Sequence, residues 1–288
     1  MLSRRLLVAA LLALPASARA EASFPLFLAN IRRKAIAQGV PESVIGAALR
    51  DLTPDPTVIA HDQNQPEFNL TWPEYRARVL TEARIDTARE AYQSNLSLLR
   101  AIGALYGVEP RIILAIWGVE SGFGTFQGKF QLIRSLATLA YQGRRGAYFT
   151  SELIAALQIL AHGYATQDML LSGWAGAMGQ PQFMPSAYLH SAVDFEGDGK
   201  RDIWHSVPDV LASIANYLAQ AGWERGETWG ERLLGAAPPL APGDRILTPN
   251  GAPIDETYLV HPNFAVIKRY NPSDFYALVV GLLADAVV

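Results

Sequence analysis

The sequence predicts a mostly α-helical fold (α+β class) with a small β-containing lobe near its C-terminal end. Apolar residues recur at helical spacing through the first two thirds of the chain, whereas Pro- and Gly-rich spacers separate short β-like runs beyond Trp229. The 288 residues are 50% hydrophobic, which is enough for a large core. Because the chain has no cysteine, its stability has to come from that core and not from disulfides.

Residues 1–20 have the pattern of a secretory signal peptide. Arg4 and Arg5 precede an apolar run over 6–14, and Ala18-Arg19-Ala20 offers a cleavage site. A membrane anchor is the alternative, but the run is too short to span a bilayer core of about 30 Å. Without a cysteine after the run, no lipid can be attached there. We expect an exported, soluble periplasmic protein that is not a lipoprotein and carries no transmembrane anchor in its mature form.

The charge of the chain argues against one class of partner. Its 24 basic and 27 acidic residues give a formal net charge of -3, and no basic stripe stands out. Nucleic acid is therefore not an expected partner.

Helices are predicted in order along the chain. We expect them over 24–38, 41–52, 71–106 with a break, 110–121, 150–166, 207–221 and 273–286, with a polar loop at 61–69. The third begins at a capping box, Thr71 with Glu74, and the fourth has Pro110 at its first position and Gly122 beyond its end. The β-like runs are Tyr258–Val260 and Phe264–Ile267.

Glu120 is the candidate catalytic residue. It follows Ile112 and Ile116 at steps of four, so on a helix it shares the core-facing side. A partly desolvated carboxyl has a raised pKa and keeps a proton available near neutral pH, as a general acid requires. The alternative is an ordinary solvated glutamate.

Residues 172–188 form a second candidate segment, rich in Gly, Met and aromatic residues and without charge. Its amides, Gln180 and Gln182, suit a neutral, hydroxyl-rich ligand such as a sugar, and its glycines let a backbone approach that ligand closely. An ordinary buried loop is the equally open alternative.

Residues 194–205 resemble an EF-hand calcium loop. Its first, third, fifth, seventh and ninth positions are Asp194, Glu196, Asp198, Lys200 (through its carbonyl) and Asp202. The twelfth position, normally a bidentate Glu, is His205, and Asp209 could supply the missing carboxylate if the chain bends back. A solvated acidic turn is the alternative. Any calcium here would be structural, since catalysis by Glu120 needs no metal cofactor.

Together these segments resemble the lytic murein transglycosylases of the membrane-bound type B group, family 103 of the glycoside hydrolases. The matching segments are Trp117–Ser121 with its trailing Gly-Phe-Gly, Ala175–Tyr188, Ala192–Trp204, Ala215–Leu218 and Arg269–Asn271. The resemblance implies one catalytic domain over 21–288: a helical N-terminal part, a lysozyme-like core at about 95–225 and a small strand-bearing lobe at about 229–270. Some relatives add a C-terminal peptidoglycan-binding module, which we do not expect here because the sequence ends soon after Tyr276.

The same resemblance implies a reaction on peptidoglycan glycan strands. Glu120 would protonate the oxygen between N-acetylmuramic acid (MurNAc) and N-acetylglucosamine (GlcNAc), then take the proton of the muramoyl 6-hydroxyl, which closes a 1,6-anhydro ring. Gln182 would lie near the scissile bond, and Tyr217, Tyr270 and Asn271 would line the cleft. Phe123, Phe183 and Trp174 are candidate sugar platforms, and a place in the buried core is an equally open alternative for each. Gly173 departs from the family, in which many members have Ser.

Two other functions stay open at this stage. A lysozyme-type hydrolase would share Glu120 but release reducing muramic acid. A non-catalytic, calcium-stabilised peptidoglycan binder is the second, although a binder has little reason to keep a desolvated acid. Proteins of cell-wall synthesis or division are candidate partners.

Overall fold

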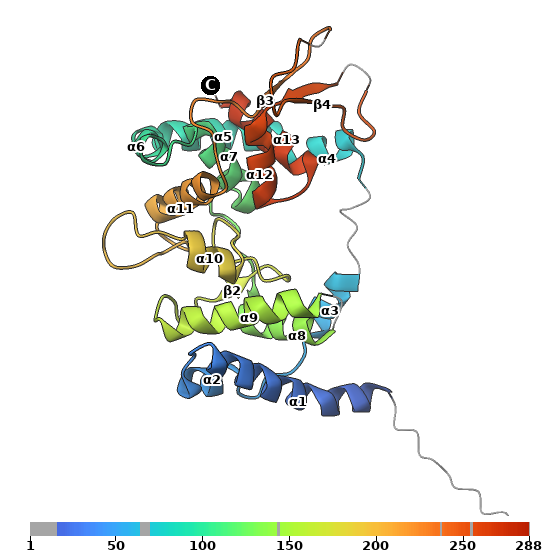
Figure 1. Cartoon of the computed structure of the whole chain (residues 1–288), viewed down its shortest axis with the longest axis vertical. Coiled ribbons are helices and arrows are strands. Elements are labelled where there is room, and N and C mark those ends of the chain that lie inside the picture. Colours follow the sequence, from blue (N-terminus) through green and yellow to red (C-terminus); the bar gives the residue numbers. More distant parts are fainter. Residues whose placement is uncertain (1–15, 64–69, 143–144, 237, 254–255, 288) are drawn as a thin grey trace, which may run out of the picture.

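The computed structural model describes residues 16–63, 70–142, 145–236, 238–253 and 256–287. Most of the predicted signal peptide and most of the predicted polar loop lie outside the described residues. Figure 1 shows a mostly helical body drawn out along one axis, with α1 at one end and a small β-containing lobe at the other.

The helices and strands confirm the predicted fold class. The helices are α1 (Ala16–Ala37), α2 (Glu42–Ala48), α3 (Pro56–Gln63), α4 (Trp72–Val79), α5 (Glu82–Ser94), α6 (Leu96–Tyr106), α7 (Pro110–Ser121), α8 (Leu132–Gln142), α9 (Gly146–Ala161), α10 (Pro185–Ser191), α11 (Val207–Gln220), α12 (Pro262–Tyr270) and α13 (Asp274–Ala286). The strands are β1 (Phe130–Gln131), β2 (Leu171–Ser172), β3 (Gly230–Arg232), β4 (Arg245–Leu247) and β5 (Tyr258–Val260).

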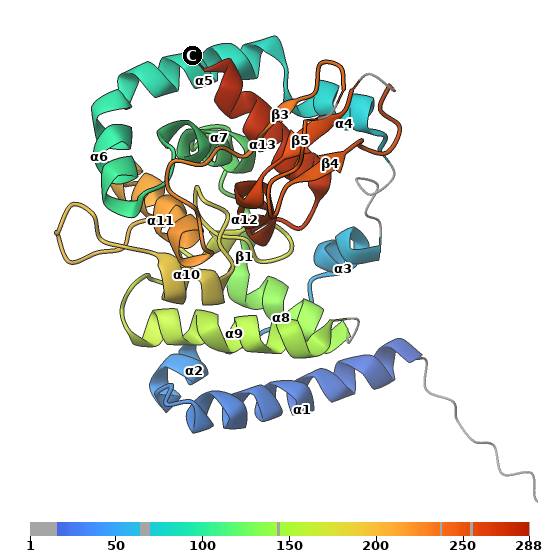
Figure 2. The same cartoon turned by 45° about the horizontal axis from the view of Figure 1, so that its top comes forward.

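Helix α7 is the centre of the fold. It contacts α5, α6, α11 and α13, and eight of its residues are buried. In Figure 2, α5 and α6 curve around one side of this group. Such packing on several sides explains why the sequence of α7 is apolar around most of its circumference.

A second layer of helices carries the N-terminal segment. Helices α8 and α9 pack against each other, α10 lies on α9, and α1 and α2 cover the opposite side (Figure 1). Helix α3 packs on α8. The segment before α4 therefore lies against α8 and α9, away from α7.

Two small antiparallel sheets complete the fold. Strand β1 pairs with β2, with Phe130 opposite Ser172. In the other sheet β5 lies between β3 and β4. Strand β5 spans Tyr258–Val260, which confirms the first of the two predicted β-like runs. This second sheet precedes α12 and forms the C-terminal lobe.

The second predicted strand, Phe264–Ile267, is wrong, because these residues belong to α12. Pro262 begins the helix, and Phe264 and Ile267 are buried three positions apart on one helical face. A short apolar run does not distinguish the two structures, and here the proline decides. Helices α3, α8 and α10 were not predicted. The predicted capping box of α4 is confirmed, because Glu74 Oε2 accepts the backbone N–H of Thr71 at 2.8 Å.

No single helix among the described residues has the length and apolar composition needed to cross a membrane. Helices α6 and α7 meet those criteria only as a pair, and they are bent by 111° where they join. Most of α7 is buried in the protein core.

Candidate active site

Glu120 lies in the last turn of α7, where this buried helix reaches the surface. The residues from Ile112 to Gly118 are buried, whereas the Glu120 side chain is partly exposed. Gly122 ends the helix with φ 57°, a left-handed conformation that glycine adopts without a steric penalty. The core therefore holds the acid in place and leaves one side of it accessible.

The surrounding protein raises the pKa of Glu120 to about 7, because loss of water disfavours the ionised carboxylate. The hydroxyl of Tyr276 donates a hydrogen bond to Glu120 Oε1 at 2.6 Å, which favours the ionised form and opposes the larger effect of burial. Near neutral pH the carboxyl is thus present in both forms, and it can give or accept a proton.

Three tyrosines from different helices gather beside this acid. Tyr276 lies in α13, Tyr270 at the end of α12 and Tyr217 in α11. Burial and the nearby charge of Glu120 raise the pKa of Tyr270 and of Tyr276 well above the ordinary value. Both phenols therefore stay protonated and can act as hydrogen-bond donors at neutral pH.

Hydrogen bonds fix the positions of the outer two tyrosines. Tyr270 donates its hydroxyl to the carbonyl of Pro181 at 2.7 Å, and Tyr217 donates to the carbonyl of Arg269 at 2.6 Å. Their rings meet edge to face, with centroids 4.8 Å apart. This pair joins α11 and α12 to the amide-bearing loop.

The two amides of that loop have different surroundings. Gln180 is buried, accepts a hydrogen bond from Trp117 Nε1 at 2.8 Å and donates one to the Trp204 carbonyl at 2.8 Å. Gln182 is partly exposed and donates to the Gly179 carbonyl at 2.7 Å. Its side-chain oxygen has no hydrogen-bond partner among the described residues and can accept one from a ligand. Gln180 is therefore structural, whereas Gln182 has a side-chain oxygen open to a ligand.

Backbone strain gathers at the same place. Among the described residues, three other than glycine have positive φ angles, and two of them are Phe123 (59°) and Gln182 (50°). Such conformations cost on the order of 1–3 kcal/mol and are found where the surrounding structure enforces them. The Phe123 ring covers Gly118 so closely that a Cβ there would lie 2.4 Å from Phe123 Cζ. Gly118 is thus required for this packing.

A pocket of about 450 Å³ opens beside the turn that follows Glu120. It is lined by residues from that turn, from the segment before β1, from the segment that leads into β2 and from the end of the acidic loop. These residues are Gly124, Thr125, Gln127, Gly128, Asp168, Met169, Leu171, Trp204 and His205. Its size falls in the range of about 300–1,000 Å³ typical of small-ligand sites.

The predicted aromatic platforms lie in different environments. Phe123 is partly exposed and meets Trp117 edge to face at 5.5 Å. Phe183 is only 2% exposed and lies 5.7 Å from the Tyr217 ring and 5.8 Å from the Tyr270 ring. With so little of its ring accessible, Phe183 supports the two tyrosines, which favours the buried-core alternative over a role as a sugar platform.

Asn271 lies at the exposed turn between α12 and α13, where its Oδ1 accepts the Ser273 N–H at 3.2 Å. This contact stabilises the turn that leads from Tyr270 to Tyr276. Its side chain remains accessible beside them.

In the acidic loop, backbone N–H groups occupy several carboxylates. Asp194 accepts those of Gly197, Asp198 and Gly199 at 2.6–3.1 Å. Glu196 is exposed, and its Oε2 accepts the Ser206 hydroxyl at 2.7 Å. In the described parts of the chain, no three side chains of the metal-binding types come together as a ready-made metal site.

Asp209 is the residue that the sequence predicts as the missing carboxylate ligand of the calcium loop. It is 1% exposed, and its two oxygens accept the N–H groups of Phe195 at 2.7 Å and Asp202 at 2.8 Å. Asp209 therefore braces the two ends of the loop in this structure, and its carboxylate is already occupied by these bonds.

Tyr276 is a residue of the site that no sequence pattern indicated. It lies 156 positions from Glu120, and only the packing of α13 on α7 brings the two together. One signal could have indicated it: a tyrosine in the first turn of an otherwise apolar helix, because a buried phenol usually finds a polar partner.

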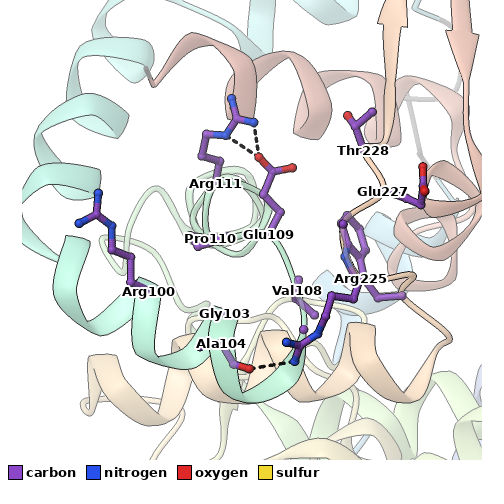
Figure 3. A pocket seen from close by; sticks show the side chains of 13 residues that line it. Arg100, Gly103, Ala104, Val108, Glu109, Pro110, Arg111, Arg225, Glu227 and Thr228 are labelled. Carbon is purple, nitrogen blue, oxygen red and sulfur yellow. Dashed lines mark hydrogen bonds and ion pairs between the residues drawn. The ribbon is translucent and has the colours of Figure 1, made fainter.

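A second pocket, of about 440 Å³, lies at the opposite end of α7 (Figure 3). There Arg111 pairs with Glu109, and Arg225 donates to the Ala104 carbonyl at 2.9 Å, near the end of α6. These contacts join the α6–α7 bend to the segment after α11. Glu120 lines neither of the two pockets, but the first lies beside the turn that follows it.

The sequence matches one protein family over nearly all of its described length. The family model of the transglycosylase SLT domain matches residues 23–241 and 235–285. Membrane-bound lytic murein transglycosylase B of Escherichia coli (strain K12) is 34% identical over 248 residues, which are 76% of this chain and 68% of that protein.

Solved structures share the fold. SltB3 from Pseudomonas aeruginosa in complex with NAG-NAM-pentapeptide superimposes with a TM-score of 0.84 at 37% identity, covering 92% of this chain and 79% of that one. Its complex with NAG-anhNAM-pentapeptide gives 0.82 at 36% identity, with the same coverage. The Escherichia coli lytic transglycosylase Slt35 in complex with calcium gives 0.77 at 30% identity, covering 90% and 92%.

The desolvated acid at the end of a buried helix thus lies in a chain whose relatives are lytic transglycosylases. The chain belongs to the family of the transglycosylase SLT domain, and it is a lytic transglycosylase that cleaves peptidoglycan.

Proposed function

We propose that the enzyme cuts the β-1,4 bond between MurNAc and GlcNAc and leaves a 1,6-anhydromuramoyl end, with Glu120 acting first as acid and then as base. The observation that carries this proposal is a single carboxyl whose pKa is about 7 and whose hydrogen-bond partner is a phenol. One such group suffices when the substrate supplies its own nucleophile.

The proton balance needs no second carboxylate. Protonated Glu120 gives its proton to the glycosidic oxygen as the bond from muramoyl C1 to that oxygen breaks and GlcNAc leaves. The muramoyl 2-acetamido group stabilises the positive charge at C1, the role that a second acid plays in ordinary glycosidases. Ionised Glu120 then removes the proton of the 6-hydroxyl as its oxygen bonds to C1. The acid is regenerated, and no water is consumed.

The surrounding residues have supporting tasks in this scheme. Tyr276 holds the carboxyl in one orientation through its hydrogen bond to Oε1. Gln182 offers its side-chain oxygen, which accepts no hydrogen bond from the described residues, to a sugar hydroxyl or amide. Tyr270 lies close to Glu120 and packs against Tyr217. We expect Asn271 and Phe123 to line the cleft around them. The relative SltB3 is known in complex with NAG-anhNAM-pentapeptide, which contains the ring that this reaction would form.

The decisive experiment is digestion of purified sacculi followed by mass spectrometry of the muropeptides. The wild-type enzyme should release anhydro-muropeptides, which are lighter by one water than the hydrated products. The Glu120→Gln variant should bind sacculi without releasing any muropeptides. Reducing muramic acid ends would instead establish a lysozyme-type hydrolase. Full lysis by Glu120→Gln would overturn the assignment of the acid.

A structural calcium ion is a second part of the proposal. The residues fit in part: Asp194, Glu196 and Asp198 alternate along the loop, Lys200 offers its carbonyl, and positive φ angles at the two loop glycines give it a tight turn. Asp209 would keep bracing the loop. Support comes from Slt35, a relative known in complex with calcium. The ion would neutralise the clustered acids and take no part in the chemistry.

The cellular setting belongs to the same proposal. Residues 1–20 have the pattern of an export signal, and murein, the substrate, lies outside the cytoplasmic membrane. We therefore assign the enzyme to the periplasm and to family 103 of the glycoside hydrolases. Proteins of cell-wall synthesis or division are its expected partners there.

A further inference from the structure

An aromatic pair links the N-terminal segment to the loop that carries Gln182. The imidazole of His61, in α3, lies over the indole of Trp174, with ring centroids 6.0 Å apart and planes inclined by 16°. The Phe130 ring meets the His61 ring edge to face, with ring centroids 5.8 Å apart and planes nearly perpendicular. His61 is exposed and Trp174 is half-buried, so the pair lies at the protein surface.

Trp174 occupies a turn next to the site. The turn is closed by hydrogen bonds from Gly176 N to the Gly173 carbonyl at 3.0 Å and from Gly173 N to the Ala177 carbonyl at 2.8 Å. A Cβ on Gly173 would lie 3.7 Å from Gln182 Oε1, the acceptor oxygen to which no described residue donates a hydrogen bond. Trp174 therefore follows directly after a residue that borders Gln182.

A close backbone contact and a strand pairing fix the position of this turn. Gly128 passes so close to it that a Cβ there would lie 2.0 Å from the carbonyl carbon of Ser172 and 2.4 Å from Gly173 N. Strand pairing of Phe130 with Ser172 continues this contact. The indole thus projects from a backbone whose position is fixed by β1 and the residues before it.

The other half of the pair is fixed as well. Arg134, in α8, donates to the carbonyls of Thr53 at 3.0 Å and Pro54 at 3.2 Å, just before α3. Thr138, also in α8, accepts the Asp55 N–H at 2.9 Å. These bonds attach the start of α3 to α8, and so they set where His61 lies over the indole.

We propose that His61 and Trp174 form a sugar-binding subsite beside Gln182, in which the indole packs on the C–H face of a glycan ring and His61 holds the indole in position. Sugars usually pack their apolar C–H faces against flat aromatic rings. An indole that is already stacked on His61 loses little side-chain freedom when a sugar binds to it. The inference rests on the proposed glycan cleft at Glu120 and adds a contribution from the N-terminal segment.

The test separates glycan binding from chemistry. His61→Ala and Trp174→Leu, which keeps much of the side-chain volume but removes the aromatic face, should each raise the KM for purified glycan strands by about 3- to 10-fold and leave kcat unchanged. His61→Phe should restore the KM, because it keeps the ring stack. His162→Ala is the matched control: this exposed histidine also lies against an aromatic ring, Tyr164 at 5.2 Å, but on the far end of α9.

Binding measured without turnover keeps the inference independent of the proposed reaction. In a Glu120→Gln background, calorimetry with the same glycan strands should show the same loss of affinity for His61→Ala and Trp174→Leu, whatever product the wild-type enzyme releases. An unchanged Kd in both variants, or an equal loss in His162→Ala, would overturn the subsite. A fall in kcat at constant KM would also overturn it, because that result assigns the pair to the chemistry at Glu120.

Discussion

At the scale of single residues, the site depends on how one carboxyl is surrounded. Burial raises the pKa of Glu120, and a single phenol, that of Tyr276, opposes part of the rise. The balance leaves a group that can exchange its proton in both directions near neutrality. Two predictions follow from this balance, one for the rate and one for stability.

The pH dependence of kcat/KM should have an alkaline limb near pH 7, because the first step needs protonated Glu120. In Tyr276→Phe the hydrogen bond that favours the ionised form is lost, so the limb should move up by about 1 pH unit and the maximal rate should fall about 10- to 100-fold. Initial rates on sacculi between pH 5 and 9 measure both. Tyr258→Phe, at a buried tyrosine in the β-containing lobe, is the control and should keep the wild-type limb.

Glu120→Gln should stabilise the folded enzyme at alkaline pH. Since the folded pKa, about 7, exceeds the ordinary value of 4.5, ionisation is harder in the folded state. The cost is absent below about pH 4.5, grows up to pH 7 and stays at its full size above it, at most about 3 kcal/mol. Denaturant unfolding at pH 4 and pH 8.5 should show a gain only at the higher pH. An equal gain at both would show that ionisation is not its cause.

The sequence indicated Glu120 but not Tyr276, for a physical reason. An acid on an apolar helical stripe is unusual within a short window, whereas a tyrosine in a first helical turn is ordinary. What makes Tyr276 part of the site is a contact across 156 positions, which no local pattern contains. Phe183 shows the reverse: the motif indicated a residue of the site, but only burial reveals that it lies beneath the tyrosines.

At the scale of elements, close backbone approaches keep the loops of the site in register. Strands β1 and β2 are two residues each, too short to be stable alone. Gly128 brings the chain against Ser172 and Gly173 at a distance that excludes any side chain. Local periodicity predicted the long helices well, but it could not predict such short elements, nor could it separate strand from helix at Phe264–Ile267.

Gly128→Ala should disrupt this approach. Its φ of 92° is unfavourable for alanine, and its Cβ would collide with the Ser172 backbone, so we expect a loss of more than about 2 kcal/mol and much weaker lysis. Gly163→Ala is the matched control, since its φ is 70° and nothing lies within 4 Å of the new Cβ. That control should cost about 1 kcal/mol and keep activity. Thermal melts and lysis assays of both variants test the difference.

The acidic loop should respond to calcium as an element. With calcium at a hundredfold excess over its Kd, the free energy of unfolding should rise by about 3 kcal/mol, and chelation should remove the gain without changing the products. Glu196→Gln should weaken the effect, whereas Glu90→Gln, an exposed glutamate in α5, should not. Melting curves that calcium leaves unmoved would remove the ion from this loop.

At the scale of the whole molecule, segments from the entire chain meet at one place. Helices α7, α11, α12 and α13 supply the acid and the tyrosines, while α3 reaches the same loop from the opposite layer. The family motifs allowed this general arrangement to be predicted. The part played by α3 could not be, because it depends on how α3 packs on α8 and on a contact between side chains 113 positions apart.

Arg134→Ala should expose that long-range dependence. Removing its bonds to Thr53 and Pro54 should cost about 1–2 kcal/mol and raise the KM for glycan strands while kcat holds. Arg89→Ala provides the control: Arg89 also donates to a distant carbonyl, that of Ala286 at 3.0 Å, but it joins α5 to α13. Equal kinetic effects in the two variants would show that attachment of α3 has no special importance.

The separation of Glu120 and Tyr276 along the sequence has a consequence for when activity can arise. The ribosome adds Tyr276 156 residues after Glu120, so during that interval the acid exists without its hydrogen-bond donor. Tyr270 and Tyr276 lie in α12 and α13, and a chain cleaved between α7 and α12 carries the acid without either of them. A fully competent wall-cutting centre therefore arises only after α13 has been made and has docked on α7.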